Sequence, residues 1–169
     1  MGRLFETNQI HKTYITYVKG KLDKEIILQG YLTSDETSII RKKKKLINQA
    51  NSNKDKFVYT EFTPIKTIKN ISKLFAKPIT GRTHQIRASL YSNQFEVLGD
   101  KIYGENENHF ISFIEKGVSF FQYGISRQAL HSYKVEFVHP FTKKKIEIIS
   151  EEPEDMKSIF STVIIDQNL

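Results

Sequence analysis

The chain has 169 residues, a length that suits a single domain able to bury a substantial core. It carries 26 lysines and arginines against 19 acidic residues, a net charge of +7 that favours a polyanionic partner. Cysteine is absent, which excludes disulfides, thiolate zinc sites and cysteine nucleophiles. The apolar runs are only a few residues long, so we expect a soluble, cytoplasmic protein without a membrane span.

The first half of the chain alternates apolar and polar residues as β-strands do. We expect a strand over residues 10–20 that forms a hairpin with a second strand over 25–32. A strand over 57–69, made irregular by Pro64, then pairs with a strand over 71–77. Tyr17, on the first of these strands, is assigned to packing, and residues 1–9 resemble the tail of a helix.

Five consecutive cations, Arg41 to Lys45, interrupt this region. They favour a solvated edge strand that lysines protect from aggregation. Attraction to an RNA backbone is the alternative interpretation. The sequence leaves both open.

A helix follows the strands. Pro78 and Gly81 predict a tight turn, after which Thr83 is the expected N-cap of a helix that begins at His84. The first turns of a helix favour acids, yet this one has Arg82, His84 and Arg87 and no acid before position 96. This charge distribution indicates an anionic partner.

The last third of the chain predicts a second hairpin, with strands over 129–139 and 144–150. Residues 110–121 fit either a helix or irregular structure. A closing helix begins after Pro153. The order of elements favours an α+β fold, predominantly an antiparallel or mixed sheet with a few helices, and one domain over residues 1–169.

Three stretches together resemble the RluA-like family of pseudouridine synthases. Residues 78–90 and 98–104 read PITGRTHQIRASL and LGDKIYG. Residues 11–20 are HKTYITYVKG, similar to the family's K-x-Y strand, and residues 127–145 are RQALHSYKVEFVHPFTKKK. The resemblance implies the catalytic fold of these enzymes, which isomerise uridine to pseudouridine in RNA, here rRNA or tRNA, without a metal or organic cofactor.

The resemblance also implies roles for individual residues. Arg87 stands where the family has a basic residue that pairs with the nucleophilic aspartate, and Tyr14 matches its active-site tyrosine. A phenol can stack on a base and transfer a proton. Arg82, Thr83, His84 and Gln85 would contact RNA. The alternative is that Thr83 is only a cap, and that His84 and Gln85 only satisfy buried backbone groups. Asp100 matches a structural loop aspartate, and the five histidines show no metal-binding spacing.

The family's H-R-L-D segment, which carries the nucleophile, has no counterpart in the sequence. We therefore expect the C-terminal portion of a catalytic domain, inactive alone and prone to self-association through an uncovered sheet edge. Arg87 would then meet a carboxylate that the chain does not supply. One alternative is a non-catalytic RNA-binding module, and a weaker one is a small anion-binding domain.

Overall fold

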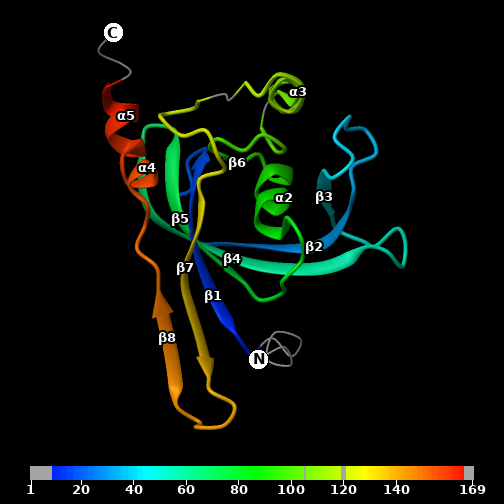
Figure 1. The fold of residues 1–169 in the computed structure, drawn as a ribbon. Coiled ribbons are helices and arrows are strands. Elements are labelled where there is room, and N and C mark those ends of the chain that lie inside the picture. Colours follow the sequence, from blue (N-terminus) through cyan, green and yellow to red (C-terminus); the bar gives the residue numbers. More distant parts are fainter. Residues whose placement is uncertain (1–8, 105, 119–120, 166–169) are drawn as a thin grey trace.

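The computed structural model describes residues 9–104, 106–118 and 121–165. Its centre is one antiparallel sheet of eight strands in the order β3-β2-β4-β5-β1-β7-β8, with β6 paired to β1 (Figure 1). The strands are β1 (His11–Lys19), β2 (Ile26–Ser34), β3 (Lys44–Ile47), β4 (Lys56–Ile68), β5 (Ile71–Pro78), β6 (Glu96–Val97), β7 (Leu130–Val138) and β8 (Lys145–Ile149). The helices are α2 (Gln85–Ser92), α3 (Glu107–Lys116), α4 (Glu154–Lys157) and α5 (Ile159–Ile165). The expected α+β fold is confirmed.

Strand β1 is central because both of its faces are apolar. Val18 belongs to the cluster that packs under α2, whereas Ile15 and Tyr17 belong to the cluster under α4 and α5. Figure 1 shows α2 and the α4–α5 segment on opposite sides of the sheet. The expected strand and the packing role of Tyr17 are confirmed.

The predicted hairpin between the first two strands is wrong. Strand β1 pairs with β5 and β7, while β2 pairs with β3 and β4. After β1, the N–H of Gly20 donates to the carbonyl of Asn70, and the N–H of Leu22 donates to the hydroxyl of Ser72. These bonds lead the chain across the end of β5, so it cannot fold back beside β1.

The other two predicted hairpins are confirmed. Strands β4 and β5 pair across a tight turn, with a register shift at Pro64. Strands β7 and β8 pair in a hairpin that projects from the body of the molecule (Figure 1). The closing helix also follows Pro153, but it is divided into α4 and α5.

Of the undecided stretch over residues 110–121, residues 110–116 are helical and belong to α3. The side chain of Asn106 accepts from the N–H of Asn108 at its start, and Gly117 in the left-handed region ends it. The helix tail expected over residues 1–9 falls almost wholly outside the described residues. Within the described ranges, no helix is long and apolar enough to cross a bilayer.

Candidate active site

A cleft of about 520 Å³ lies between the start of α2 and the middle of the sheet. All three stretches on which the family resemblance rests contribute to it. Tyr14 and Arg87 both line this cleft, so the structure brings the two candidate catalytic residues together. The full lining is Lys12, Tyr14, Pro78, Thr80, Gly81, Arg82, Thr83, His84, Gln85, Ile86, Arg87, Gln128 and Leu130.

The charge of the cleft is one-sided. Lys12, Arg82 and Arg87 are cations, and no aspartate or glutamate is among the described residues that line it. Lys12 was not predicted as a site residue, but the K-x-Y spacing contained the signal, because residues two apart on a strand share a face. A cationic cleft of this size suits an anionic ligand with a planar group.

Tyr14 is placed by the sheet. It lies on β1 opposite Ala76 of β5 and Ser132 of β7, and it is half-buried. The register of β1 against β7 shifts between Thr13 and Tyr14. Such irregularities re-aim side chains next to functional sites.

The predicted N-cap at Thr83 is wrong. Helix α2 begins at Gln85, and His84 occupies the cap position in the left-handed region, with φ of 60° and no capping side-chain bond. This backbone turn leaves Thr83 exposed beside the cleft. The residue that organises the turn is Gln85 instead.

The side-chain amide of Gln85 is fully engaged inside the protein. Its oxygen accepts from the N–H of Arg82 and the hydroxyl of Thr80, both at 2.9 Å. Its nitrogen donates to the carbonyl of Tyr59 and the hydroxyl of Thr60. This confirms the alternative role for Gln85, which holds the turn in place and presents Arg82 and Thr83 to the cleft.

Arg87 has a carboxylate partner within the chain. Its Nε and Nη2 donate to the two oxygens of Asp100 at 2.5 and 2.6 Å. Sequence reasoning did not foresee this internal partner, because it expected only a carboxylate from outside the chain. A guanidinium has five N–H donors, and this bidentate bond uses two of them. The other three N–H groups are not used by Asp100, and Arg87 lines the cleft.

Asp100 makes contacts within the chain that are typical of a structural residue. Its side chain is fully buried, and Oδ1 also accepts from the N–H groups of Ile102 and Tyr103. The carboxylate thus holds both the 99–104 loop and the arginine. With every oxygen engaged, Asp100 has the contacts of an anchor for Arg87.

Tyr103 completes this support, and sequence reasoning missed it. Its buried ring lies 5.0 Å from the guanidinium carbon of Arg87, and its hydroxyl lies 3.0 Å from Nδ1 of His84. Burial raises the pKa of Tyr103 to about 12. Burial also lowers the pKa of His84, and the nearby charge of Arg87 lowers it further. The tyrosine of the G-D-x-x-Y-G string was the available signal.

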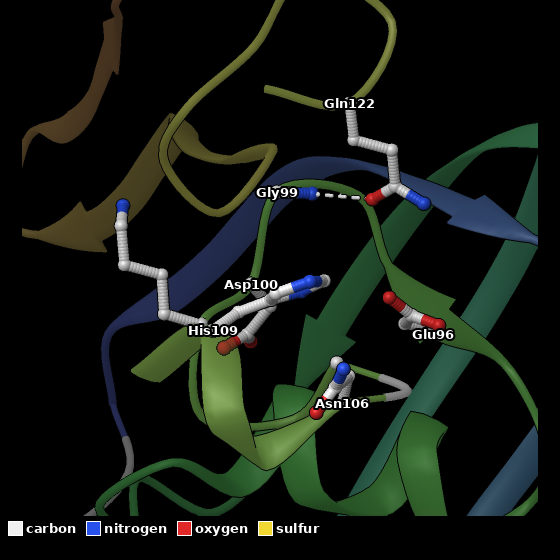
Figure 2. Close-up of a pocket in the computed structure, with 8 residues that line it drawn as sticks. Glu96, Gly99, Asp100, Asn106, His109 and Gln122 are labelled. Atoms are coloured by element: carbon white, nitrogen blue, oxygen red, sulfur yellow. Dashed lines mark hydrogen bonds between the residues drawn. The ribbon is translucent and has the colours of Figure 1, made fainter. Parts of the chain in front are cut away.

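A second hollow of about 300 Å³ lies on the other side of the 99–104 loop. Figure 2 shows Glu96, Asn106, His109 and Gln122 around it, and the Gln122 side chain accepts from the N–H of Gly99. Asp100 lines this hollow while it holds Arg87 on the cleft side. In the part of the chain that the structure describes, no group of histidine and carboxylate side chains is placed to hold a metal ion.

Comparisons with known proteins identify the family. A model described as RNA pseudouridylate synthase matches residues 1–92. The ribosomal large subunit pseudouridine synthase D of Zymomonas mobilis is 28% identical over 95% of this chain and 47% of its own length. An uncharacterized RNA pseudouridine synthase of Helicobacter pylori is 30% identical over 100% of this chain and 49% of its own.

A solved structure shares the fold. Human RNA pseudouridylate synthase domain containing 4 superimposes with a TM-score of 0.69 at 16% identity, over 96% of this chain and 66% of that one. The fold is therefore that of a pseudouridylate synthase domain. The chain belongs to the RNA pseudouridylate synthase family, and it spans about half the length of the curated relatives it matches.

Proposed function

We propose that this chain forms the RNA-binding and arginine-bearing part of an enzyme that isomerises uridine to pseudouridine in rRNA or tRNA in the cytoplasm. The observation that carries the proposal is the cleft itself. It is lined by both Tyr14 and an anchored Arg87, and it holds cations without an acid among its described lining residues. The membership of the family supplies the reaction.

In this reaction an aspartate attacks the target nucleoside and the glycosidic C–N bond breaks. The base then turns and rejoins the ribose through C5, which loses its proton. The uridine must leave its stack to reach the cleft. Tyr14 would stack on the base or accept a proton, because a phenol offers a flat face and an ionisable hydroxyl.

The roles of the cations follow from their contacts. Arg87, fixed by Asp100, would hold the nucleophilic carboxylate with its remaining N–H groups. Arg82 and Thr83 are exposed at the rim, and His84 lies beside them, so these three would contact the RNA backbone. Gln85 would act by shaping the turn.

The nucleophile is the missing component. The six aspartates of the sequence are Asp23, Asp35, Asp55, Asp100, Asp155 and Asp166, and none follows H-R-L. We therefore propose that this chain, as a portion of a catalytic domain, is inactive until a carboxylate is supplied to Arg87. No cofactor is required in this proposal.

Two measurements test the proposal. Tritium release from RNA labelled at uridine C5 should be absent with this chain and present with the full open reading frame. Release by the chain alone would contradict the missing nucleophile. In binding titrations with uridine-containing RNA, Arg82→Ala should weaken affinity about tenfold. The control Lys21→Ala, which removes an exposed lysine between β1 and β2, should leave the affinity unchanged.

A non-catalytic RNA-binding module is the second candidate. The absence of an acidic residue from the described cleft lining favours it. The two candidates differ in one outcome, since an open reading frame that binds RNA but releases no tritium supports the module.

Self-association is part of the same proposal. Strands β3 and β8 form the edges of the sheet, and Ile148 and Ile149 of β8 are about half exposed. Unpaired edges of this kind template pairing with another chain. Sizing chromatography across a wide concentration range should show a dimer, and a constant monomer would contradict this.

A further inference from the structure

The structure divides the five consecutive cations of residues 41–45 into two groups. Three are paired with other side chains of the protein. Lys43 is 3% exposed and donates to Glu107 at 2.9 Å, Lys44 donates to the hydroxyl of Ser34, and Lys45 lies 3.7 Å from Asp35. Arg41 and Lys42 remain exposed, and neither forms a salt bridge with any described carboxylate.

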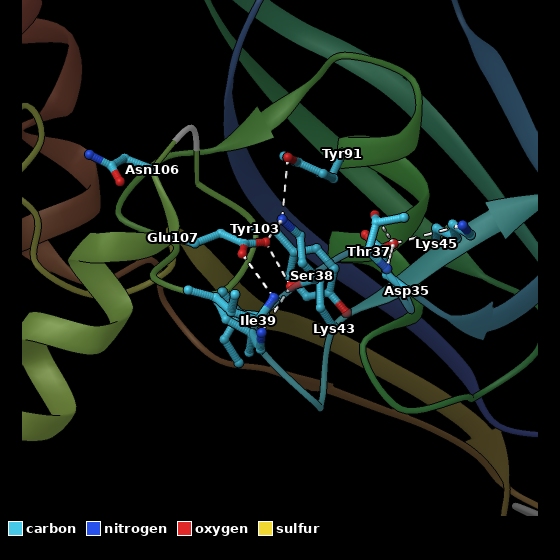
Figure 3. A network of polar contacts seen from close by, with 12 residues as sticks. Asp35, Thr37, Ser38, Ile39, Lys43, Lys45, Tyr91, Tyr103, Asn106 and Glu107 are labelled. Carbon is cyan, nitrogen blue, oxygen red and sulfur yellow. Dashed lines mark hydrogen bonds and ion pairs between the residues drawn. The ribbon is translucent and has the colours of Figure 1, made fainter.

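The segment is held rigidly by Glu107 (Figure 3). One carboxylate oxygen accepts from Lys43 and from the hydroxyl of Ser38, and the other accepts from the N–H of Ile39. Lys43 also donates to the hydroxyl of Tyr91 on α2. Burial by itself lowers the pKa of Lys43, but these bonds outweigh burial and raise it. The backbone before β3 is therefore fixed with Lys43 charged.

The same segment is fastened to the mouth of the cleft. The N–H of Lys44 donates to the hydroxyl of Tyr103, which in turn contacts His84 of the cleft lining. The positive charge of Lys42 is among the causes that lower the pKa of His84. Lys42 therefore lies next to the cleft rim that Arg82 and Thr83 form.

We propose that Arg41 and Lys42 form a preorganised contact for two backbone phosphates of the RNA strand beside the nucleotide held in the cleft. The inference rests on the proposed function, since it assumes that RNA occupies the cleft. Two unpaired cations release condensed counterions when they meet phosphates. Because internal contacts already order the segment, binding costs little further conformational entropy.

The test is a salt series of fluorescence-anisotropy titrations with a single-stranded RNA that carries one central uridine. Arg41→Ala/Lys42→Ala should weaken binding on the order of tenfold and reduce the slope of log affinity against log salt by about 1.4, which is two phosphates at about 0.7 each. The matched control is Lys21→Ala/Lys24→Ala, which removes the same charge from two exposed lysines between β1 and β2. Equal losses in both double variants would overturn the proposal.

A second variant separates preorganisation from net charge. Glu107→Gln makes the protein more basic, so a purely charge-driven interaction would tighten. Our proposal predicts instead that Glu107→Gln weakens RNA affinity by about two- to fivefold. A loss of this order is expected when a loop must become ordered on binding. Tighter binding by Glu107→Gln would overturn the role of the anchored segment.

The outcomes also separate this inference from the proposed function. If Arg82→Ala weakens binding and Arg41→Ala/Lys42→Ala does not, the cleft binds RNA and only this inference fails. If the unmodified chain shows no salt-dependent RNA binding, both fail. Circular dichroism of each variant shows whether a loss reflects unfolding.

Discussion

Two bidentate arginine–aspartate pairs in this protein have the same chemistry and opposite surroundings. In the cleft, Arg87 and Asp100 have side chains that are 11% and 0% exposed. Near α4, Arg127 and Asp155 are 43% and 40% exposed, with bonds of 2.9 and 2.8 Å. Both arginines belong to stretches that carry the family resemblance.

The two pairs differ in what happens to each aspartate when its arginine is removed. An exposed carboxylate that loses its arginine is solvated by water, so the pair adds little. The side chain of Asp100 is fully buried, so the removal of Arg87 leaves a buried charge without a counterion. The comparison indicates that the cleft pair fixes Arg87 in place, whereas the surface pair is dispensable.

The largest expected effect is that of Arg87→Ala. It should reduce the free energy of unfolding by about 3–5 kcal/mol, because Asp100 stays buried without a counterion. Urea unfolding followed by circular dichroism measures this. A loss of stability below about 1 kcal/mol would show that the buried pair contributes no more than the surface pair, and would contradict the proposed difference between them.

Glu107→Gln tests an intermediate case, because Lys43 is buried and Glu107 is about one quarter exposed. The glutamine keeps a hydrogen-bond acceptor but removes the charge that faces the ammonium of Lys43. We expect a loss of about 1–2 kcal/mol in urea unfolding, smaller than for Arg87→Ala. A loss as large as that of Arg87→Ala would show that partial exposure does not relieve the penalty.

The pH dependence of stability tests the surroundings of the buried pair through its neighbour His84. The folded protein lowers the pKa of His84, so the unfolded chain takes up the proton first. The contribution of His84 to the free energy of unfolding is therefore fully present above the ordinary histidine pKa of about 6.5. It is lost as pH falls through that value toward the pKa of the folded protein. Urea unfolding at pH 7.5 and 5.5 should show this decrease in the unmodified chain.

The control for this effect is His84→Asn. Asparagine does not titrate and tolerates the left-handed backbone at this position. The variant should lose less stability between the two pH values than the unmodified chain. An identical decrease in both proteins would show that other groups cause it.

Arg127→Ala should have the smallest effect, below about 1 kcal/mol, because both members of the surface pair are solvated. It is also the matched control for Arg87→Ala in RNA titrations, since each removes one arginine. We expect RNA affinity to fall for Arg87→Ala and to stay within about twofold for Arg127→Ala. A larger loss at Arg127 would extend the RNA contact toward α4.

Local patterns predicted the strands and the cleft residues well. Apolar, β-branched and alternating patterns predicted strands at β1, β2, β4, β5, β7 and β8, because strand periodicity is set by a sheet that buries one or both faces. The short motifs predicted Tyr14 and Arg87 as residues of one site, and both line the same cleft. These features depend on neighbours within a few residues, which a single sequence displays.

Long-range partners were the source of each error. Whether β1 pairs with β2 or with β5 depends on bonds from residues 20 and 22 to residues 70 and 72. The role of Thr83 changed because Gln85 reaches Tyr59 and Thr60 on β4, which draws the chain into a left-handed turn at His84. No local propensity contains these contacts.

The sequence alone therefore determined the family, the α+β class and the pairing of Tyr14 and Arg87 in one cleft, because motifs and periodicity are properties of adjacent positions. Only the tertiary structure decided which charges are paired. It gave Arg87 the carboxylate of Asp100, buried Lys43 against Glu107 and left Arg41 and Lys42 exposed. Which charges pair depends on the distances between them and on their burial in the folded protein. Sequence order alone determines neither the distances nor the burial.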